Sequence, residues 1–230
     1  MEAKRRTVAE LVAERWGDHR PGLWYEERTL TQHEFAAGAA ARAALLADLL
    51  PPGAEPHVGV LLDNTPEYPL WLGAAALAGA AVAGINPTRR GPELARDILH
   101  TECRVLVTGH THLPLLDGLE LPDVRLLLTD TDEYDDLLAP YTTAVPDPSR
   151  ATPDARLLLY FTSASTAAPK PALSTHGPPA PARAAATTGP RVGADPAGHA
   201  QTSRRSAPPV PRREGGRRLR RPPSGRRGPG

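Results

Sequence analysis

Apolar residues between positions 57 and 161 fall into short continuous runs, separated by segments in which they recur at helical spacing. The runs predict strands at 57–62, 81–86, 104–108, 124–129 and 156–161. The intervening segments predict helices or helical turns near 66–79, 92–101, 112–118 and 132–138. Because continuous apolar runs are typical of strands buried on both faces, we expect an α/β fold with a mostly parallel sheet covered by helices.

Two capping motifs precede this alternating region. Thr7-x-x-Glu10 and Thr31-x-x-Glu34 each allow a Thr hydroxyl and a Glu carboxylate to bind backbone N–H groups at a helix start. They predict helices near 8–16 and 32–50. The segment LWYEERTLT between them has aromatic and β-branched residues around a polar centre, which predicts a short hairpin.

The composition changes after Lys170. Residues 1–170 carry 15 Lys and Arg against 24 Asp and Glu, whereas residues 171–230 carry 12 against 2 and are rich in Pro and Gly. With few large apolar side chains to offset the entropy of ordering, residues 171–230 are expected to be disordered. We place the domain boundary at residue 176, which leaves 177–230 as a basic tail.

Residue usage suggests an origin for this tail. Most of the 27 basic residues are Arg, as expected of a GC-rich gene, in which a shifted reading frame yields Pro, Arg, Gly and Ala. One hypothesis is therefore that the tail is an out-of-frame product that interrupts a longer fold. The alternative is a genuine disordered tail.

The cellular compartment is suggested by two features. Cys103 is the only cysteine, so no intrachain disulfide can form. The N-terminal segment is amphipathic and lacks the apolar core of a signal peptide. The run from Pro69 to Ile85 is too short and too rich in Ala and Gly for a membrane span, and we interpret it as a buried helix followed by a strand. We expect a cytoplasmic protein.

The strand predicted at 156–161 runs into a hydroxyl-rich segment that ends in Pro-Lys. In parallel sheets, ligands bind at the carboxyl ends of strands. A polyphosphate site needs hydroxyl and backbone donors together with a cation. Hydroxyls come from Thr162, Ser163, Ser165 and Thr166, and the cation from Lys170. From the residues alone, a nucleotide phosphate loop and a Ser/Thr-rich surface turn both remain open.

The segment YFTSASTAAPKPALSTHG resembles the signature of the adenylate-forming, AMP-binding superfamily, which includes the acyl-CoA synthetases. Six residues match the signature in place, and Thr175-His176 fits its continuation. The order of the segments WYEERTLTQHEF, VGVLLDN and ELARDILHTE is also similar, so the resemblance covers about residues 7–177 and is nearest to the fatty acyl-CoA synthetases. The matching residues are Thr162, Ser163, Ser165, Thr166, Pro169 and Lys170.

The resemblance implies the N-terminal portion of the adenylate-forming fold and a two-step reaction. ATP, with Mg²⁺, and a carboxylic acid, here a fatty acid, give an acyl-adenylate and pyrophosphate, and coenzyme A then takes the acyl group. The Thr162–Lys170 loop would hold the β- and γ-phosphates by positioning and charge neutralisation. No residue of this chain is assigned a covalent catalytic role or a metal-ligand role.

The signature is altered in three places. Ala164 and Ala167 replace glycines, and Pro171 stands where Gly or Ala is usual. Alanine at positive φ costs about 1–2 kcal/mol per position, so ATP binding is expected to be weaker by about one to three orders of magnitude. The family's later adenine, ribose and C-terminal lysine motifs are also absent from this sequence. We therefore expect a truncated chain that is weak or inactive.

Other features suggest different functions. Paired arginines in the tail, for example Arg204-Arg205 and Arg217-Arg218, would bind nucleic acid through phosphates without sequence specificity, which is the alternative function. His110-x-His112 has a spacing that could serve a metal, but we interpret both histidines as solvated. Cys103 is interpreted as a small buried side chain rather than a nucleophile.

Overall fold

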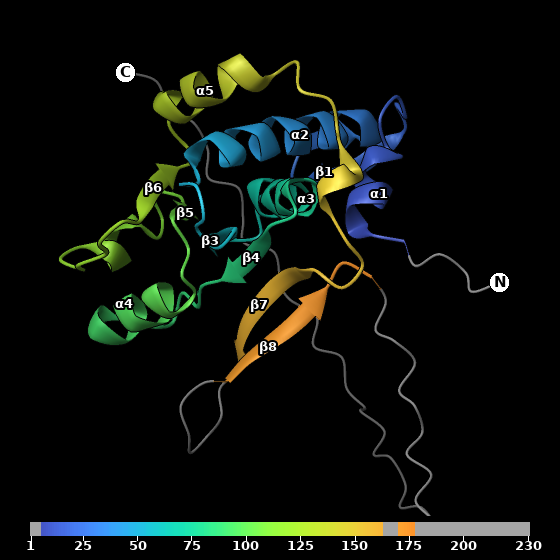
Figure 1. The fold of residues 1–230 in the computed structure, drawn as a ribbon. Coiled ribbons are helices and arrows are strands. Elements are labelled where there is room, and N and C mark those ends of the chain that lie inside the picture. Colours follow the sequence, from blue (N-terminus) through green and yellow to red (C-terminus); the bar gives the residue numbers. More distant parts are fainter. Residues whose placement is uncertain (1–5, 163–169, 178–230) are drawn as a thin grey trace, which may run out of the picture. The chain divides into compact units, whose positions relative to one another are not determined.

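A six-stranded sheet organises the part of the chain that the computed structural model describes, residues 6–162 and 170–177 (Figure 1). The strand order is β6-β5-β3-β4-β7-β8, and all neighbouring pairs except β7–β8 are parallel. The α/β, mostly parallel prediction is therefore confirmed. The strands are β3 His57–Leu61, β4 Ala81–Gly84, β5 Val105–Thr108, β6 Arg125–Leu128, β7 Arg156–Thr162 and β8 Lys170–Thr175.

Helices cover both faces of this sheet. One face packs against α2, α3 and α5 through a core that includes Trp71, Val107 and Leu127. The other face packs against α4 through Leu94, Ile98 and Leu106. The helices are α1 Val8–Ala13, α2 Gln32–Leu49, α3 Glu67–Ala78, α4 Gly91–His100 and α5 Asp132–Leu138. The short 3₁₀ helices are η1 Leu113–Leu116, η2 Ala139–Tyr141 and η3 Pro148–Arg150.

Both predicted capping boxes are present. The Thr7 hydroxyl accepts from Glu10 N at 3.1 Å, while Thr7 N donates to a Glu10 carboxylate oxygen at 2.9 Å. Thr31 and Glu34 repeat the arrangement at the start of α2. The hairpin between the two helices consists of β1 Pro21–Tyr25 and β2 Arg28–Thr31, as predicted.

Several boundaries differ from the prediction. Helix α1 ends at Ala13 rather than near residue 16, because the chain turns through Gly17, whose φ is +81°. The helix predicted at 112–118 is the 3₁₀ turn η1. The buried helix and strand predicted from Pro69 to Ile85 correspond to most of α3 and to β4. Among the described residues, no helix is both long and apolar enough to cross a membrane.

Strand β8 corrects the expectation that residues 171–230 are disordered. Residues 170–175 pair antiparallel with β7, from Thr162↔Lys170 to Arg156↔Thr175. His176 follows and is buried, and its carbonyl accepts from Val8 N at 3.2 Å. The physical reason is that β7 has a free edge, so a segment with little apolar character of its own gains backbone hydrogen bonds there. Residues 178–230, most of the predicted tail, lie outside the described residues.

A buried polar network joins the three helices on one face. Arg42 of α2 donates to both carboxylate oxygens of Glu67 in α3, through Nε at 2.9 Å and through a second, shorter contact. The Tyr134 hydroxyl of α5 donates to Glu67 at 2.8 Å and accepts from Trp71 Nε1 at 3.0 Å. Burial raises the pKa of Tyr134, so its hydroxyl stays protonated. Because each charge has partners, the network ties α2, α3 and α5 together.

Candidate functional site at the carboxyl edge of the sheet

The carboxyl ends of β3, β4, β5, β6 and β7 lie at one edge of the sheet, because these five strands run parallel. Each end leads into a loop that carries polar side chains. In an open parallel sheet this edge is where ligands bind. The loop residues include Asp63, Asn86, His110 and Asp130, and the predicted phosphate loop follows β7.

The hairpin of β7 and β8 holds the two ends of the predicted phosphate loop. In the ladder, Thr162 is paired with Lys170, so the backbones of the first and last predicted residues lie side by side. Ser163, Ser165 and Thr166, together with Ala164 and Ala167, lie outside the described residues. Their roles stay predictions.

Strand β4 brings two tyrosines to this region. A Cβ built on Gly84, the last residue of β4, would lie 3.7 Å from Tyr68 Oη and 3.9 Å from Tyr160 Cδ1. Burial raises the pKa of the Tyr68 phenol, and Tyr160 adds to the shift. The Tyr68 hydroxyl therefore remains protonated at neutral pH and can donate a hydrogen bond. Tyr160 is 42% exposed, two residues before Thr162.

These tyrosines were missed in the sequence. The sequence places Tyr160 in the strand at 156–161 and at the start of the signature-like segment, and Tyr68 in the helix near 66–79, but it assigns neither tyrosine to the site. Period-two alternation could have placed Tyr160 on the same side of β7 as Thr162. No local signal links Tyr68 to Tyr160, because their proximity depends on the pairing of β4 with β7.

The loop after β4 is ordered by its own hydrogen bonds and carries two arginines. Asn86 Oδ1 accepts from the Thr88 N–H at 2.9 Å and from its hydroxyl at 2.8 Å. Arg89 is paired with Glu93 at 3.1 Å and with the buried Asp97 at 3.3 Å. Arg90 instead donates to the carbonyls of Pro87 and Arg89, at 2.5 and 2.7 Å. The positive charge of Arg89 is therefore balanced by two carboxylates, whereas the hydrogen bonds of the exposed Arg90 go to neutral carbonyls in the loop after β4.

The two histidines singled out in the sequence each pair with an aspartate. His110 Nδ1 lies 2.9 Å from Asp130 Oδ1, and His112 Nε2 lies 3.1 Å from Asp63 Oδ1. Burial alone would raise the pKa of Asp130, but hydrogen bonds from His110 lower it overall. Within residues 6–162 and 170–177, no three His, Cys, Asp or Glu side chains are grouped so that they could hold a metal ion. The pairs connect the loops after β3, β5 and β6.

Cys103 is 3% exposed and packs at the start of β5, and burial raises the pKa of its thiol. The interpretation of Cys103 as a small buried side chain is confirmed. A thiol in this environment is a poor nucleophile.

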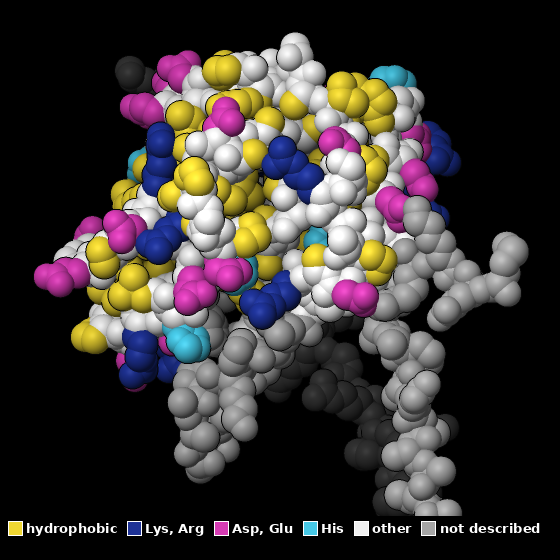
Figure 2. Space-filling model, in the orientation of Figure 1, with side chains coloured by type: hydrophobic (Ala, Val, Ile, Leu, Met, Phe, Trp, Pro, Cys, Tyr) yellow, Lys and Arg dark blue, Asp and Glu magenta, His cyan; other side chains and the backbone are white. Residues whose placement is uncertain are grey.

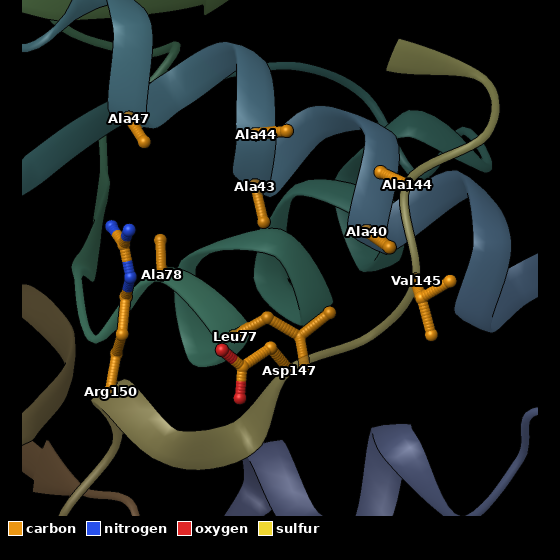
Figure 3. Close-up of a pocket in the computed structure, with 10 residues that line it drawn as sticks. All are labelled: Ala40, Ala43, Ala44, Ala47, Leu77, Ala78, Ala144, Val145, Asp147 and Arg150. Carbon is orange, nitrogen blue, oxygen red and sulfur yellow. The ribbon is translucent and has the colours of Figure 1, made fainter.

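A separate hollow lies away from this edge, between α2, α3 and residues 144–150 (Figure 3). It has a volume of about 160 Å³ and is lined mainly by alanines. Arg150 of η3 and Asp147, the residue before η3, reach it from one side, while Ala43, Ala44 and Ala47 reach it from α2. Asp147 also accepts from Ser149 N at 2.9 Å, which lowers the pKa of its carboxyl. We interpret the hollow as imperfect packing beneath an exposed loop.

Comparison with known proteins identifies related sequences. Residues 9–196 match the family described as AMP-binding enzyme. The chain is 41% identical over 180 residues to steroid-22-oyl-CoA synthetase of Rhodococcus jostii, covering 77% of this chain and 32% of that protein. It is 35% identical over 172 residues to the medium/long-chain-fatty-acid–CoA ligase FadD17 of Mycobacterium tuberculosis, covering 74% and 33%. The chain thus spans about a third of the length of these relatives.

Solved structures show the same fold at lower identity. An anthranilate CoA ligase, AuaEII, in complex with anthranoyl-AMP matches with a TM-score of 0.63 at 20% identity, covering 75% of this chain and 34% of that one. A fatty acyl CoA synthetase of Mycobacterium tuberculosis matches with a TM-score of 0.60 at 21% identity, covering 74% and 34%. The described sheet therefore has the topology found in the N-terminal part of such ligases.

Proposed function

Because this chain belongs to the AMP-binding enzyme family, we propose that its β7–β8 hairpin is the ATP-phosphate site of an acid-activating ligase. ATP would react, as its magnesium complex, with a carboxylic acid to give an acyl-adenylate and pyrophosphate. Coenzyme A would then take the acyl group as a thioester. The residues proposed to contact the phosphates are Thr162, Ser163, Ser165, Thr166 and Lys170.

One observation carries this proposal. The signature-like segment begins where β7 reaches the carboxyl edge of the sheet and ends where β8 starts, with Thr162 and Lys170 paired in the ladder. Seven residues therefore connect two anchored strand ends at the edge where parallel sheets bind ligands. A Ser/Thr-rich surface turn without a ligand could lie at either edge of the sheet, whereas a phosphate loop is expected at this one.

The chemistry proposed for the hairpin is charge neutralisation and positioning. Hydroxyls and backbone N–H groups would bind phosphate oxygens, and Lys170 would supply a positive charge. Arg90, whose guanidinium donates to the backbone carbonyls of Pro87 and Arg89, would add a second cation at the same edge. The residues present at this edge thus suit a polyanion, and the magnesium ion would arrive with the nucleotide.

The acid is proposed to be apolar. The similar proteins are named for a steroid acid and for medium- and long-chain fatty acids. This chain spans about a third of their length, so we propose the class of acid from the relatives alone. Within the described residues, no feature favours nucleic-acid binding, the alternative proposed for the tail.

Lys170 gives a direct test, because Lys4 is the only other lysine of the chain. Binding of Mg-ATP to the full chain would be measured by isothermal titration calorimetry for the wild type, Lys170→Ala and Lys4→Ala. We expect Lys170→Ala to weaken binding at least tenfold, and Lys4→Ala to leave it unchanged. Equal affinity of the wild type and Lys170→Ala would contradict the proposal.

A further inference from the structure

Two tyrosines and a glycine form a small niche at the carboxyl edge of the sheet. The register of β4 against β7, in which Ala83 pairs with Leu159, sets Gly84 beside Tyr160. A Cβ built on Gly84 would lie 3.7 Å from Tyr68 Oη and 3.9 Å from Tyr160 Cδ1. Because glycine has no side chain, β4 leaves the Tyr68 hydroxyl uncovered at this point.

The Tyr68 hydroxyl has no hydrogen-bond partner within the described part of the chain. In this it differs from the other tyrosines of the helices, since Tyr134 donates to Glu67 and Tyr141 donates to Asp48. The Tyr68 side chain is half-buried, and burial raises the pKa of its phenol, which therefore keeps its proton. A protonated phenol without a protein acceptor is a donor for a ligand.

The niche lies next to the proposed phosphate loop. Tyr160, whose side chain is 42% exposed, precedes Thr162 by two residues, which is about 7 Å along a strand. The far end of the loop returns to the same place, because Thr162 pairs with Lys170. Of all the groups of a bound nucleotide, the phosphates held by this loop would therefore lie nearest to the niche.

The surface charges of the chain give a polyanion little general attraction. Residues 1–170 carry more Asp and Glu than Lys and Arg. On the face drawn in Figure 2, basic and acidic side chains are interspersed rather than gathered into one basic patch. Binding of a polyanion then depends on individual donors more than on a broad positive field.

We propose that Tyr68 is a ligand-binding residue whose hydroxyl donates a hydrogen bond to a phosphate oxygen of the nucleotide held by the β7–β8 hairpin. This inference rests on the proposed function, since it takes the hairpin as the phosphate site. A hydrogen bond to an ionised oxygen is stronger than one between neutral groups, so a single phenol contributes appreciably. Gly84 then determines access, because a larger side chain at this position would cover the hydroxyl.

The test removes the hydroxyl or covers it. Binding of Mg-ATP to the full chain would be measured by isothermal titration calorimetry. Tyr68→Phe should weaken binding at least about tenfold, whereas Tyr141→Phe, which removes a phenol bound to Asp48, should leave it unchanged. Gly84→Val keeps the Tyr68 hydroxyl but places methyl groups against it, so it should cause a similar loss.

Two further measurements separate a binding role from a structural one. The double variant Tyr68→Phe/Gly84→Val should bind Mg-ATP about as weakly as Tyr68→Phe alone, because both changes remove the same hydrogen bond. Tyr68→Phe should weaken the binding of Mg-tripolyphosphate by the same factor as that of Mg-ATP, because the proposed acceptor is a phosphate oxygen. Urea denaturation would check that each variant folds.

Lys170→Ala, measured in the same series, separates this inference from the proposed function. If Lys170→Ala weakens binding and Tyr68→Phe does not, the hairpin binds phosphate without Tyr68, so this inference is wrong and the proposed function stands. If neither change weakens binding, the proposed function fails and the inference fails with it. Additive losses in the double variant, or a loss for Mg-ATP but not for Mg-tripolyphosphate, would also overturn the inference.

Discussion

His176 couples the end of β8 to pH. The side chain is buried, and neither ring nitrogen has a hydrogen-bond partner among the described residues. Burial lowers the pKa of His176 below its usual value of 6.5. Below that pH the unfolded chain binds a proton that the folded chain does not, so the free energy of unfolding falls as the pH falls, by at most about 1.4 kcal/mol per pH unit.

Replacing His176 should remove this pH dependence. We expect His176→Leu to flatten the fall in unfolding free energy between about pH 6.5 and 5.5, measured by urea denaturation at each pH. His19→Gln, a change at an exposed histidine in the turn before β1, serves as the control and should keep the slope of the wild type. If His176→Leu left the slope unchanged, a group other than His176 would cause the pH dependence of the unfolding free energy.

Two tyrosines allow the stability contributed by a buried hydrogen bond to be compared with that of an exposed one. Tyr134→Phe removes the donor to Glu67 and the acceptor for Trp71 Nε1, so it should lower the free energy of unfolding by about 1–3 kcal/mol. Tyr141→Phe removes a hydrogen bond of 2.7 Å to Asp48 at the surface and should cost less than about 0.5 kcal/mol. Chemical denaturation followed by tryptophan fluorescence would measure both. Equal effects would contradict the structural role of the network.

At the scale of the elements, helices α2 and α3 contact each other through small residues. Gly73 of α3 is tightly packed, because a Cβ on it would lie 3.0 Å from Ala39 Cβ and 3.3 Å from Phe35 Cζ. Ala44 of α2 has space beside it instead, because it borders the hollow between α2 and η3 (Figure 3). Gly73→Val should therefore destabilise the fold by about 1–3 kcal/mol, and Ala44→Leu should change its stability by less than about 0.5 kcal/mol. The urea midpoints of unfolding of the two variants would test this difference. If Ala44→Leu destabilised the fold as much as Gly73→Val, the hollow could not accommodate a larger side chain.

Local patterns predicted most of these elements, and the failures have a common cause. The strands from His57 to Thr162 were predictable because each is a continuous apolar run, and both capping boxes because their contacts span three residues. Strand β8 was missed because Lys170–Thr175 has little apolar character and depends on the edge of β7. The approach of Tyr68 to Tyr160 was missed for the same reason, since strand pairing creates it.

At the scale of the whole molecule, the described residues combine a sheet covered on both faces with a hairpin that returns from its ligand-binding edge. The types of residue proposed for the phosphate site were predictable, since Thr162 and Lys170 flank a signature-like run of hydroxyls. The partners at the same edge, Arg90 and Tyr68, were not, because they come from other loops and helices. The residues of the proposed phosphate loop are thus close together in the sequence, whereas the residues around the loop come from distant parts of the chain.

The central claim is that the segment between β7 and β8 is a phosphate loop weakened by two alanines. The most direct test is the dissociation constant of Mg-ATP for the full chain carrying Ala164→Gly and Ala167→Gly, compared with the wild type. Because glycine adopts positive φ without the cost of about 1–2 kcal/mol that an alanine carries, and because it leaves more room beside the phosphates, we expect binding to tighten by about ten- to thousandfold. Adding Lys170→Ala to this variant should reverse the gain. Unchanged or weaker binding in the double-glycine variant would contradict the account.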